Sequence, residues 1–325
     1  MGNPPSLNSM VHILFPNSVP SFYIQFLKDF HFVQPFYMIE WILYRIFRQG
    51  VERVLTDYHV HMIESGDFSV EYLKKYLEQA EKRGIGDLGI SEHAYMFYET
   101  SNIIEGNEWV ENRRKLHMKD YLAMFEQAHR EGLPVKLSIE MDYTPGKERE
   151  MEDFINRYPF DYVIGSIHWL GDFGIDLAIH RHEYEKREIN QIYEAYFDQV
   201  VTLAESKLFD FIGHIDLVKI FKYKPTDQVF LEQQYDRAVA ALAKSGTSIE
   251  ISTAGIRKPV GEIYPDPILL QKCYDAGVTI VLSSDAHQPL HVGEDYDQAL
   301  ELAKSVGYKE IQVITQRKKE AHPLG

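Results

Sequence analysis

Two histidines separated by a single residue, His59 and His61, stand out in the segment TDYHVH. Successive residues of a strand face opposite sides, so residues two apart point the same way, and both imidazoles can reach one centre. Asp285 and His287, in the segment SSDAH, have the same spacing near the other end of the chain. Imidazole and carboxylate together suit zinc, manganese or iron. The two pairs therefore suggest two halves of one metal site.

Metal-competent side chains also occur where most of the other apolar, strand-like segments end. A single histidine at such a place is more often structural than a ligand, but many independent coincidences at the same end of successive strands are improbable. This many ligands exceeds the needs of one ion, which favours two or three ions that share bridging carboxylates. Only the sixth segment, TSIEIST, ends without such a side chain; the others contribute Glu92, His93, Glu140, His168, His214 and Asp216.

Some of these acidic residues have simpler explanations. Glu92 is adjacent to His93 and so faces the other side of the strand, where it would support the site structurally. Asp216 has an alternative role as the cap of the following helix, and Asp285 has one as an N-cap before the segment AHQPL. These alternatives stay open for each residue taken alone.

Basic residues near the predicted strand ends are candidates for binding a phosphate group. Arg257 follows the sixth segment in TAGIRKP, where a guanidinium could grip phosphate in bidentate fashion, and Lys258 is a weaker point-charge candidate. The alternative for Arg257 is a surface ion pair. The segment AIHRHE contains His180 and His182 at the spacing of the first pair but lies in a predicted loop. We exclude these histidines from the metal site and keep Arg181 as a lesser substrate contact.

These residues need a framework that brings strand ends together. From about residue 50 onwards, short strand-like segments alternate with longer segments of helical periodicity, which predicts an α/β fold with a parallel sheet. No glycine-rich phosphate turn follows the first strand, so a closed barrel is favoured over an open doubly wound sheet. The carboxyl ends of barrel strands converge on one mouth. The predicted helices span roughly residues 69–83, 112–131, 148–157, 184–206, 227–245, 266–276 and 294–306.

Composition limits the classes of partner. The 325 residues include 34 Lys and Arg against 49 Asp and Glu, a formal net charge of −15 that disfavours nucleic acid as the main ligand. The single cysteine excludes a disulfide framework and a cysteine-based zinc finger, and it fits a cytoplasmic protein. No uninterrupted apolar stretch is long enough to span a membrane.

Residues 1–49 form an aromatic-rich extension ahead of the predicted barrel, which we place at residues 50–325. Residues 36–48 are predicted to form a short helix that is apolar over most of its circumference. We favour packing on the barrel or on a second subunit, and hence a homo-oligomer contact, over contact with a membrane surface. A biological start further along the chain is a third alternative.

The ordered segments DYHVH, SEHA, SIEMDY, GSIHWL, GHIDLVK and SSDAH resemble the polymerase-and-histidinol-phosphatase (PHP) superfamily over about residues 52–317. GSIHWL and TAGIRKP point to its histidinol-phosphate phosphatase branch. The resemblance implies a distorted seven-stranded (β/α) barrel with up to three metal ions. A further ligand position falls on Asp67, with Glu64 as its rival. The other implied ligands are His59, His61, His93, Glu140, His168, His214, Asp285 and His287.

The resemblance also implies a metal-dependent phosphomonoesterase of histidine biosynthesis that converts L-histidinol phosphate to L-histidinol and phosphate. A metal-bridging water would attack phosphorus, and Asp285 or His287 would give a proton to the leaving oxygen. Arg257 would grip the phosphate, with Lys258 and Arg181 as weaker contacts. The alternatives are a PHP-type hydrolase of another phosphoester or of an amidohydrolase-like substrate and, less favoured, a non-catalytic PHP domain.

Overall fold

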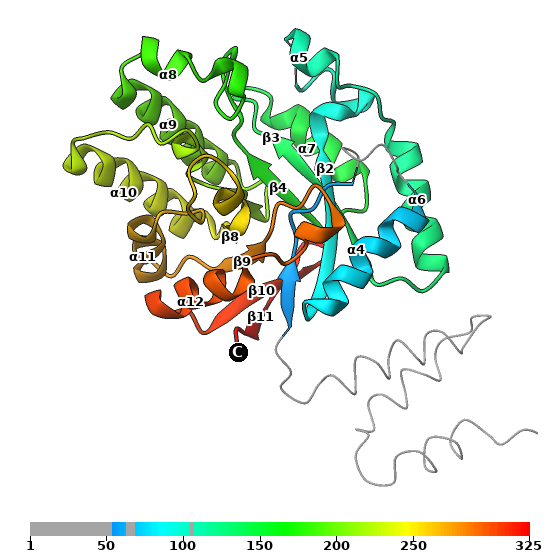
Figure 1. The fold of residues 1–325 in the computed structure, drawn as a ribbon. Helices are drawn as coiled ribbons and strands as arrows, with labels where there is room; N and C mark the ends of the chain where they lie inside the picture. The colour runs from blue at the N-terminus through cyan, green and yellow to red at the C-terminus, as the bar shows by residue number, and fades with distance from the viewer. Residues whose placement is uncertain (1–53, 63–68, 105–106) are drawn as a thin grey trace, which may run out of the picture. The chain divides into compact units, whose positions relative to one another are not determined.

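A seven-stranded parallel sheet forms the centre of the computed structural model, which describes residues 54–62, 69–104 and 107–325 (Figure 1). The strands neighbour one another in the order β1, β2, β3, β4, β7, β8 and β9. Each neighbouring pair is parallel. The strands are β1 (Leu55–Asp57), β2 (Ile85–His93), β3 (Val135–Asp142), β4 (Tyr162–Ser166), β7 (Phe211–Ile212), β8 (Ser248–Ser252) and β9 (Ile280–Ser283).

The first and last strands of this sheet meet and close it into a barrel. The Thr56 hydroxyl donates to the carbonyl oxygen of Leu282 at 3.1 Å. Beyond the strand ends, the His61 N–H donates to the carbonyl oxygen of Ala286 at 2.7 Å. The carboxylate of Asp57 accepts hydrogen bonds from the backbone N–H groups of Ser284 and Gly293. The predicted seven-stranded (β/α) barrel is confirmed, and its closure brings the His59 pair beside the Asp285 pair.

Helices lie around the outside of the strands (Figure 1). Their ends carry the expected local signals: the Ser69 hydroxyl accepts from the N–H of Tyr72, and the Asp227 carboxylate accepts from the first turn of the helix after it. Gly246 ends a helix with φ +77°, a backbone conformation that glycine adopts without strain. The long helices are α4 (Val70–Lys82), α6 (Met118–Arg130), α7 (Glu148–Arg157), α9 (Ile189–Ser206), α10 (Gln228–Ser245), α11 (Pro267–Asp275) and α12 (Tyr296–Val306).

Two predicted helices differ from those observed. The helix predicted at 112–131 begins only at Met118, as α6, because Leu116 pairs with Phe97 just before it; the short α5 (Glu108–Glu111) precedes the predicted range. The helix predicted at 184–206 is divided into α8 (Glu183–Lys186) and α9, since the backbone at Arg187 and Glu188 is extended. The sequence pattern revealed neither the late start of α6 nor the break between α8 and α9.

Two antiparallel hairpins add to the barrel. One joins β5 (Trp169–Leu170) to β6 (Phe173–Gly174) directly after the fourth barrel strand, and the other joins β10 (Glu310–Thr315) to β11 (Lys318–Pro323) at the end of the chain. No helix in the described ranges is long and apolar enough to cross a membrane. The helix predicted at 36–48 and the whole extension of residues 1–49 lie outside the described residues.

Candidate metal centre

Glu140 lies at the centre of the site. It is fully buried near the end of β3. Its Oε1 atom lies 3.1 Å from Nε2 of His59 and 3.2 Å from Nε2 of His214. The same oxygen is 3.5 Å from Nε2 of His168, and Oε2 is 2.6 Å from Nδ1 of His93. Histidines at or after the ends of β1, β2, β4 and β7 thus converge on one carboxylate.

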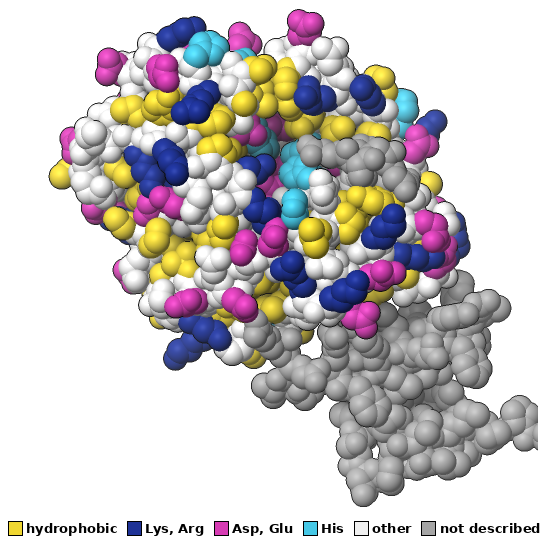
Figure 2. All heavy atoms as spheres, viewed as in Figure 1, with side chains coloured by type: hydrophobic (Ala, Val, Ile, Leu, Met, Phe, Trp, Pro, Cys, Tyr) yellow, Lys and Arg dark blue, Asp and Glu magenta, His cyan; other side chains and the backbone are white. Residues whose placement is uncertain are grey.

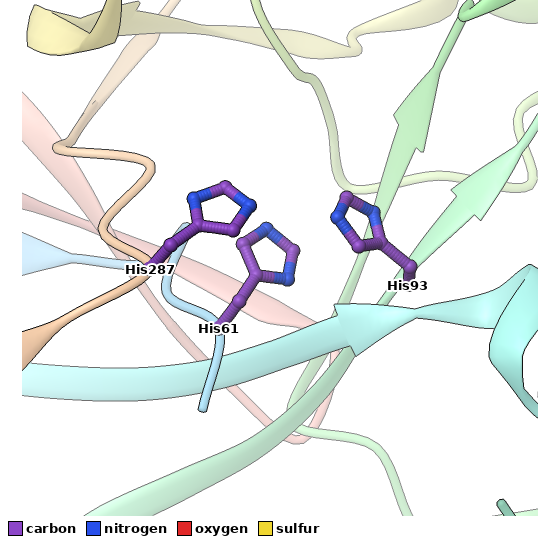
Figure 3. Close-up of side chains that lie close together, drawn as sticks. All are labelled: His61, His93 and His287. Atoms are coloured by element: carbon purple, nitrogen blue, oxygen red, sulfur yellow. The ribbon is translucent and has the colours of Figure 1, made fainter. Parts of the chain in front are cut away.

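The two pairs singled out by their spacing lie side by side. Oδ1 of Asp285 is 3.5 Å from Nε2 of His61 and 3.9 Å from Nε2 of His59. The ring centre of His61 is 4.1 Å from that of His93 and 4.5 Å from that of His287. Figure 3 shows these three rings facing a common space. Three sets of side chains have ligand atoms close enough to hold an ion: His61, His93 and His287; His59, Glu140 and His214; and His59, His61 and Asp285.

Buried polar atoms of this cluster lack the hydrogen bonds that folded proteins normally supply. Among the described residues, no hydrogen bond satisfies Nε2 of His59, either ring nitrogen of His61, or either oxygen of Glu140. Leaving such groups unsatisfied costs about 1–3 kcal/mol each. Nitrogen and carboxylate donors are the set that zinc, manganese and iron prefer. The residues therefore fit divalent metal ions.

The charges of the cluster shift its proton affinities. Burial lowers the pKa of the His168 imidazole, but the carboxylates of Glu140 and Asp142 outweigh it and raise that pKa to about 10. His59 also has a pKa raised well above its ordinary value, since Glu140, Glu250 and Asp285 outweigh its burial. The pKa of His61 is lowered by burial and by the neighbouring rings of His93 and His287. Without a cation, protons held by His59 and His168 balance the carboxylates.

Metal binding should therefore release protons. His59 and His168 have raised pKa values, so both carry protons at neutral pH in the metal-free protein, and an arriving cation must displace them. We expect the apparent affinity for zinc to fall about tenfold per pH unit for each proton displaced as the pH decreases. Titration calorimetry in buffers of different ionisation enthalpy measures the release. A binding heat that is the same in every buffer would contradict it.

A second layer of carboxylates orients the histidines. Oδ1 of Asp142 lies 2.8 Å from Nδ1 of His168. The carboxylate of Glu250 lies 3.0 Å from Nδ1 of His59 and accepts the backbone N–H of His214 at 2.6 Å. Such partners fix which ring nitrogen carries the proton and turn the other nitrogen toward the metal.

Glu250 is the residue that sequence reasoning missed. It lies in β8, the strand predicted to end without a metal-competent side chain, and it is fully buried. The sequence did contain a signal for it: a glutamate stands inside the apolar strand-like segment TSIEIST. A buried carboxylate is costly unless it is paired, which predicts a partner for Glu250. Glu92, predicted to support the site structurally, is buried; its Oε1 atom accepts the backbone N–H of Met62 at 2.6 Å, and its Oε2 atom lies 3.9 Å from Nδ1 of His61.

Asp216 lies outside the metal cluster. Its carboxylate contacts Nζ of Lys219 at 2.9 Å and accepts the backbone N–H of Asp266 at 2.7 Å. Asp216 occupies the N-cap position of the short helix 217–219, but its side chain makes no capping hydrogen bond there. The capping alternative for Asp285 is wrong, because the next short helix has Gln288 as its N-cap.

A cavity of about 200 Å³ opens onto the cluster. Figure 2 shows histidine and acidic side chains inside a hollow near the centre of the visible face of the barrel. Its lining includes cluster residues, aromatic side chains and charged groups of both signs. Besides His168, Asp285 and His287 of the cluster, the lining includes Trp109, Trp169, Asp176, Lys258 and Tyr264.

The predicted phosphate contacts are placed differently from one another. Lys258 lines the cavity, and its charge contributes to the lowered pKa of Asp285. Arg257 is not among the lining residues: its guanidinium donates to the carbonyl oxygen of Ser284 and lies 3.4 Å from Glu294. This matches the ion-pair alternative, so a direct role of Arg257 on phosphate stays a prediction.

The segment AIHRHE lies away from the cluster. Arg181 is exposed, with its guanidinium carbon 5.9 Å from the ring centre of Phe221, and it does not line the cavity. Nδ1 of His180 accepts the N–H of Gly174 at 2.9 Å, and His182 is exposed. Neither histidine belongs to the groups of ligand atoms found among the described residues. Asp67 and Glu64, the candidates for the further ligand position, lie outside the described residues.

Comparison with known proteins identifies relatives over most of the chain. The model of the PHP domain family matches residues 57–254. A probable histidinol-phosphatase of Deinococcus radiodurans is 34% identical over 263 residues, which are 79% of this chain and 95% of the relative. The histidinol-phosphatase of Bacillus subtilis is 24% identical, covering 75% of this chain and 98% of the relative.

Solved structures share the fold. The histidinol phosphate phosphatase of Lactococcus lactis, solved with zinc, L-histidinol and phosphate, superposes with a TM-score of 0.66 at 22% identity. The match covers 83% of this chain and 100% of that one. A putative histidinol phosphatase of Listeria monocytogenes gives a TM-score of 0.62 at 23% identity, over 75% of this chain and 99% of the other.

Proposed function

The chain belongs to the PHP domain family, and from this premise we propose that it is a metal-dependent phosphomonoesterase that hydrolyses L-histidinol phosphate to L-histidinol and phosphate. The observation that carries the proposal is the convergence of histidines and carboxylates on Glu140 beneath a cavity of small-molecule size. The relative of Deinococcus radiodurans, matched over 95% of its length, supports the substrate. The reaction belongs to histidine biosynthesis.

The metal centre would hold two or three divalent ions of zinc, manganese or iron. The three overlapping sets of ligand atoms support more than one ion, since His59 and His61 each belong to two sets. Bound ions would supply the positive charge that activates a water molecule and neutralises the phosphoryl oxygens. Asp67, or Glu64 in its place, remains our candidate for the additional ligand.

The chain's own residues supply the remaining steps. Asp285 and His287 both line the cavity, and we retain both as candidates for giving a proton to the leaving oxygen. Nδ1 of His287 lies 3.1 Å from the carbonyl oxygen of Asp285, so the proton on this nitrogen is donated to that oxygen. Lys258 would bind the phosphate as a point charge. Arg257 would hold the Ser284 carbonyl and so position the turn that carries Asp285.

Two alanine variants separate these roles. Lys258→Ala should weaken inhibition by inorganic phosphate about tenfold, because a charged partner of the phosphate is lost. Arg257→Ala should lower the melting temperature and metal content, because the Ser284 turn loses its anchor, with a smaller effect on phosphate inhibition. Phosphate inhibition constants and metal content measure the difference. If phosphate still inhibits Lys258→Ala strongly but no longer inhibits Arg257→Ala, then Arg257 and not Lys258 is the phosphate contact.

The substrate is tested by comparing L-histidinol phosphate with other phosphomonoesters, phosphodiesters and amides under identical metal conditions. We expect kcat/KM for L-histidinol phosphate to exceed that of the other substrates. A higher value for another phosphoester or for an amide would replace the proposed substrate with that class. A cytoplasmic location, the absence of a nucleic-acid partner and a homo-oligomer formed through residues 1–49 remain predictions.

A further inference from the structure

Asp176 is an acidic residue of the cavity that the metal cluster does not use. It follows β6 and lines the cavity, and it is only partly buried. The N–H of the preceding residue, Ile175, donates to the carbonyl oxygen of His168 at 2.9 Å. The hydroxyl of Tyr184 donates to the carbonyl oxygen of Ile175 at 2.9 Å. These bonds fix the segment that carries Asp176 beside the metal cluster.

The carboxylate of Asp176 makes no hydrogen bond or ion pair with any residue in the described ranges. Its charge nevertheless acts on the site, since it contributes to the raised pKa values of His168 and Tyr264. The other cavity carboxylate considered above, Asp285, faces the histidines His59 and His61. A carboxylate that is partly withdrawn from water gains when a cation arrives beside it.

Aromatic side chains surround the same space. The rings of Trp109 and Trp169 meet edge to face with centres 5.7 Å apart, and both line the cavity. Tyr95 packs against Trp109 at 5.4 Å. Aromatic faces attract organic cations as well as flat rings. The guanidinium of Arg113 is exposed, lies 3.6 Å from the ring centre of Trp109 and also lines the cavity.

Lys258 and Asp176 place opposite charges on the lining of the cavity. Lys258 acts on Asp285 at the metal cluster, where a phosphate would bind, and Asp176 presents an unpaired negative charge beside His168. A ligand with a phosphate at one end and an ammonium group at the other matches this arrangement. Phosphomonoesters without an amine would leave Asp176 buried under the ligand without a partner, which is costly.

We propose that Asp176 binds the ammonium group of the substrate and makes the enzyme selective for amine-bearing phosphomonoesters. The inference rests on the proposed function and assigns its specificity to one residue. Asp176 does not contact the reacting atoms in this assignment. Its contribution is to substrate affinity, so it should appear chiefly in KM and not in kcat.

The test compares two substrates that differ only in the amine: L-histidinol phosphate and 3-(imidazol-4-yl)propyl phosphate. In Asp176→Asn, kcat/KM for L-histidinol phosphate should fall about 10- to 100-fold through a higher KM. Hydrolysis of the compound without the amine should stay the same or improve, since it has no ammonium group for Asp176 to bind and the variant no longer buries an unpaired charge under it. Asp176→Glu keeps the carboxylate, so it should recover part of the preference for L-histidinol phosphate over the compound without the amine.

The matched control is Asp172→Asn, which removes the same charge from an exposed residue of the same hairpin that does not line the cavity. This variant should behave as the unmodified protein. If Asp176→Asn weakens both substrates equally, or neither, the assignment to the amine is overturned while the proposed function stands.

The inference about Asp176 can also be tested if the proposed phosphatase function fails. If the unmodified, metal-loaded protein releases no phosphate from L-histidinol phosphate, the proposed function fails. Calorimetric binding of L-histidinol and of 3-(imidazol-4-yl)propan-1-ol then decides the inference alone. Tighter binding of the amine that Asp176→Asn abolishes would support it, and equal binding of the two alcohols would overturn it.

Discussion

Replacing Glu140 with glutamine should remove almost all activity, lowering kcat for L-histidinol phosphate at least about 1,000-fold, or ~4 kcal/mol of transition-state stabilisation. The Glu140 oxygens lie 2.6–3.5 Å from nitrogens of four histidines. Glutamine keeps the shape but removes the charge and directs an amide N–H₂ at ring nitrogens. The variant should therefore lose metal together with activity, as elemental analysis and steady-state kinetics would measure.

The matched control is Glu152→Gln, at an exposed position on α7. It should retain the metal content and rate of the unmodified protein. Folding is checked by the melting temperature of each metal-free protein, because removing one partner of a buried charge pair is itself destabilising. A Glu140→Gln protein with full metal content and undiminished turnover would show that the convergence on this carboxylate has no role in the chemistry.

Glu250→Gln should give the second-largest effect, a loss of about 10- to 100-fold in metal affinity and in kcat/KM. The Glu250 carboxylate holds Nδ1 of His59 and the backbone N–H of His214. Glutamine is uncharged and has a single acceptor oxygen, so it would bind these two groups more weakly than the carboxylate does. His59 would then be held less firmly with its Nε2 atom toward Glu140.

Competition with a chromogenic chelator measures the metal affinity, and Glu301→Gln on the exposed face of α12 is the control. Added metal should restore much of the activity of Glu250→Gln, because the direct ligands remain. A positioning role is wrong if Glu250→Gln and Glu301→Gln have the same metal affinity.

The barrel and most of the cluster were predictable because strand geometry connects spacing to direction. Residues two apart on a strand share a face, so the spacing of His59 and His61, and of Asp285 and His287, already indicated one centre. The alternation of strand-like and helical segments predicted the parallel barrel, and a barrel brings strand ends together. The sequence therefore indicated which side chains meet, although not their distances.

Residues that act from the middle of a strand or through a tertiary contact were not predictable in this way. Glu250 lies within β8, and its partners His59 and His214 come from distant parts of the sequence. The position of Arg257 depends on the Ser284 carbonyl and on Glu294, which no local pattern connects to it. The place of Asp176 depends on the β5–β6 hairpin, which is too short to give a periodic signal.

The central claim is that metal ions held around Glu140 allow the chain to hydrolyse L-histidinol phosphate. The most direct measurement is phosphate release from L-histidinol phosphate by purified protein, before and after chelation and then after addition of zinc, manganese or iron. The account predicts rapid release that chelation abolishes and at least one of these metals restores. Release that survives complete removal of metal, or metal-loaded protein that releases no phosphate, would contradict it.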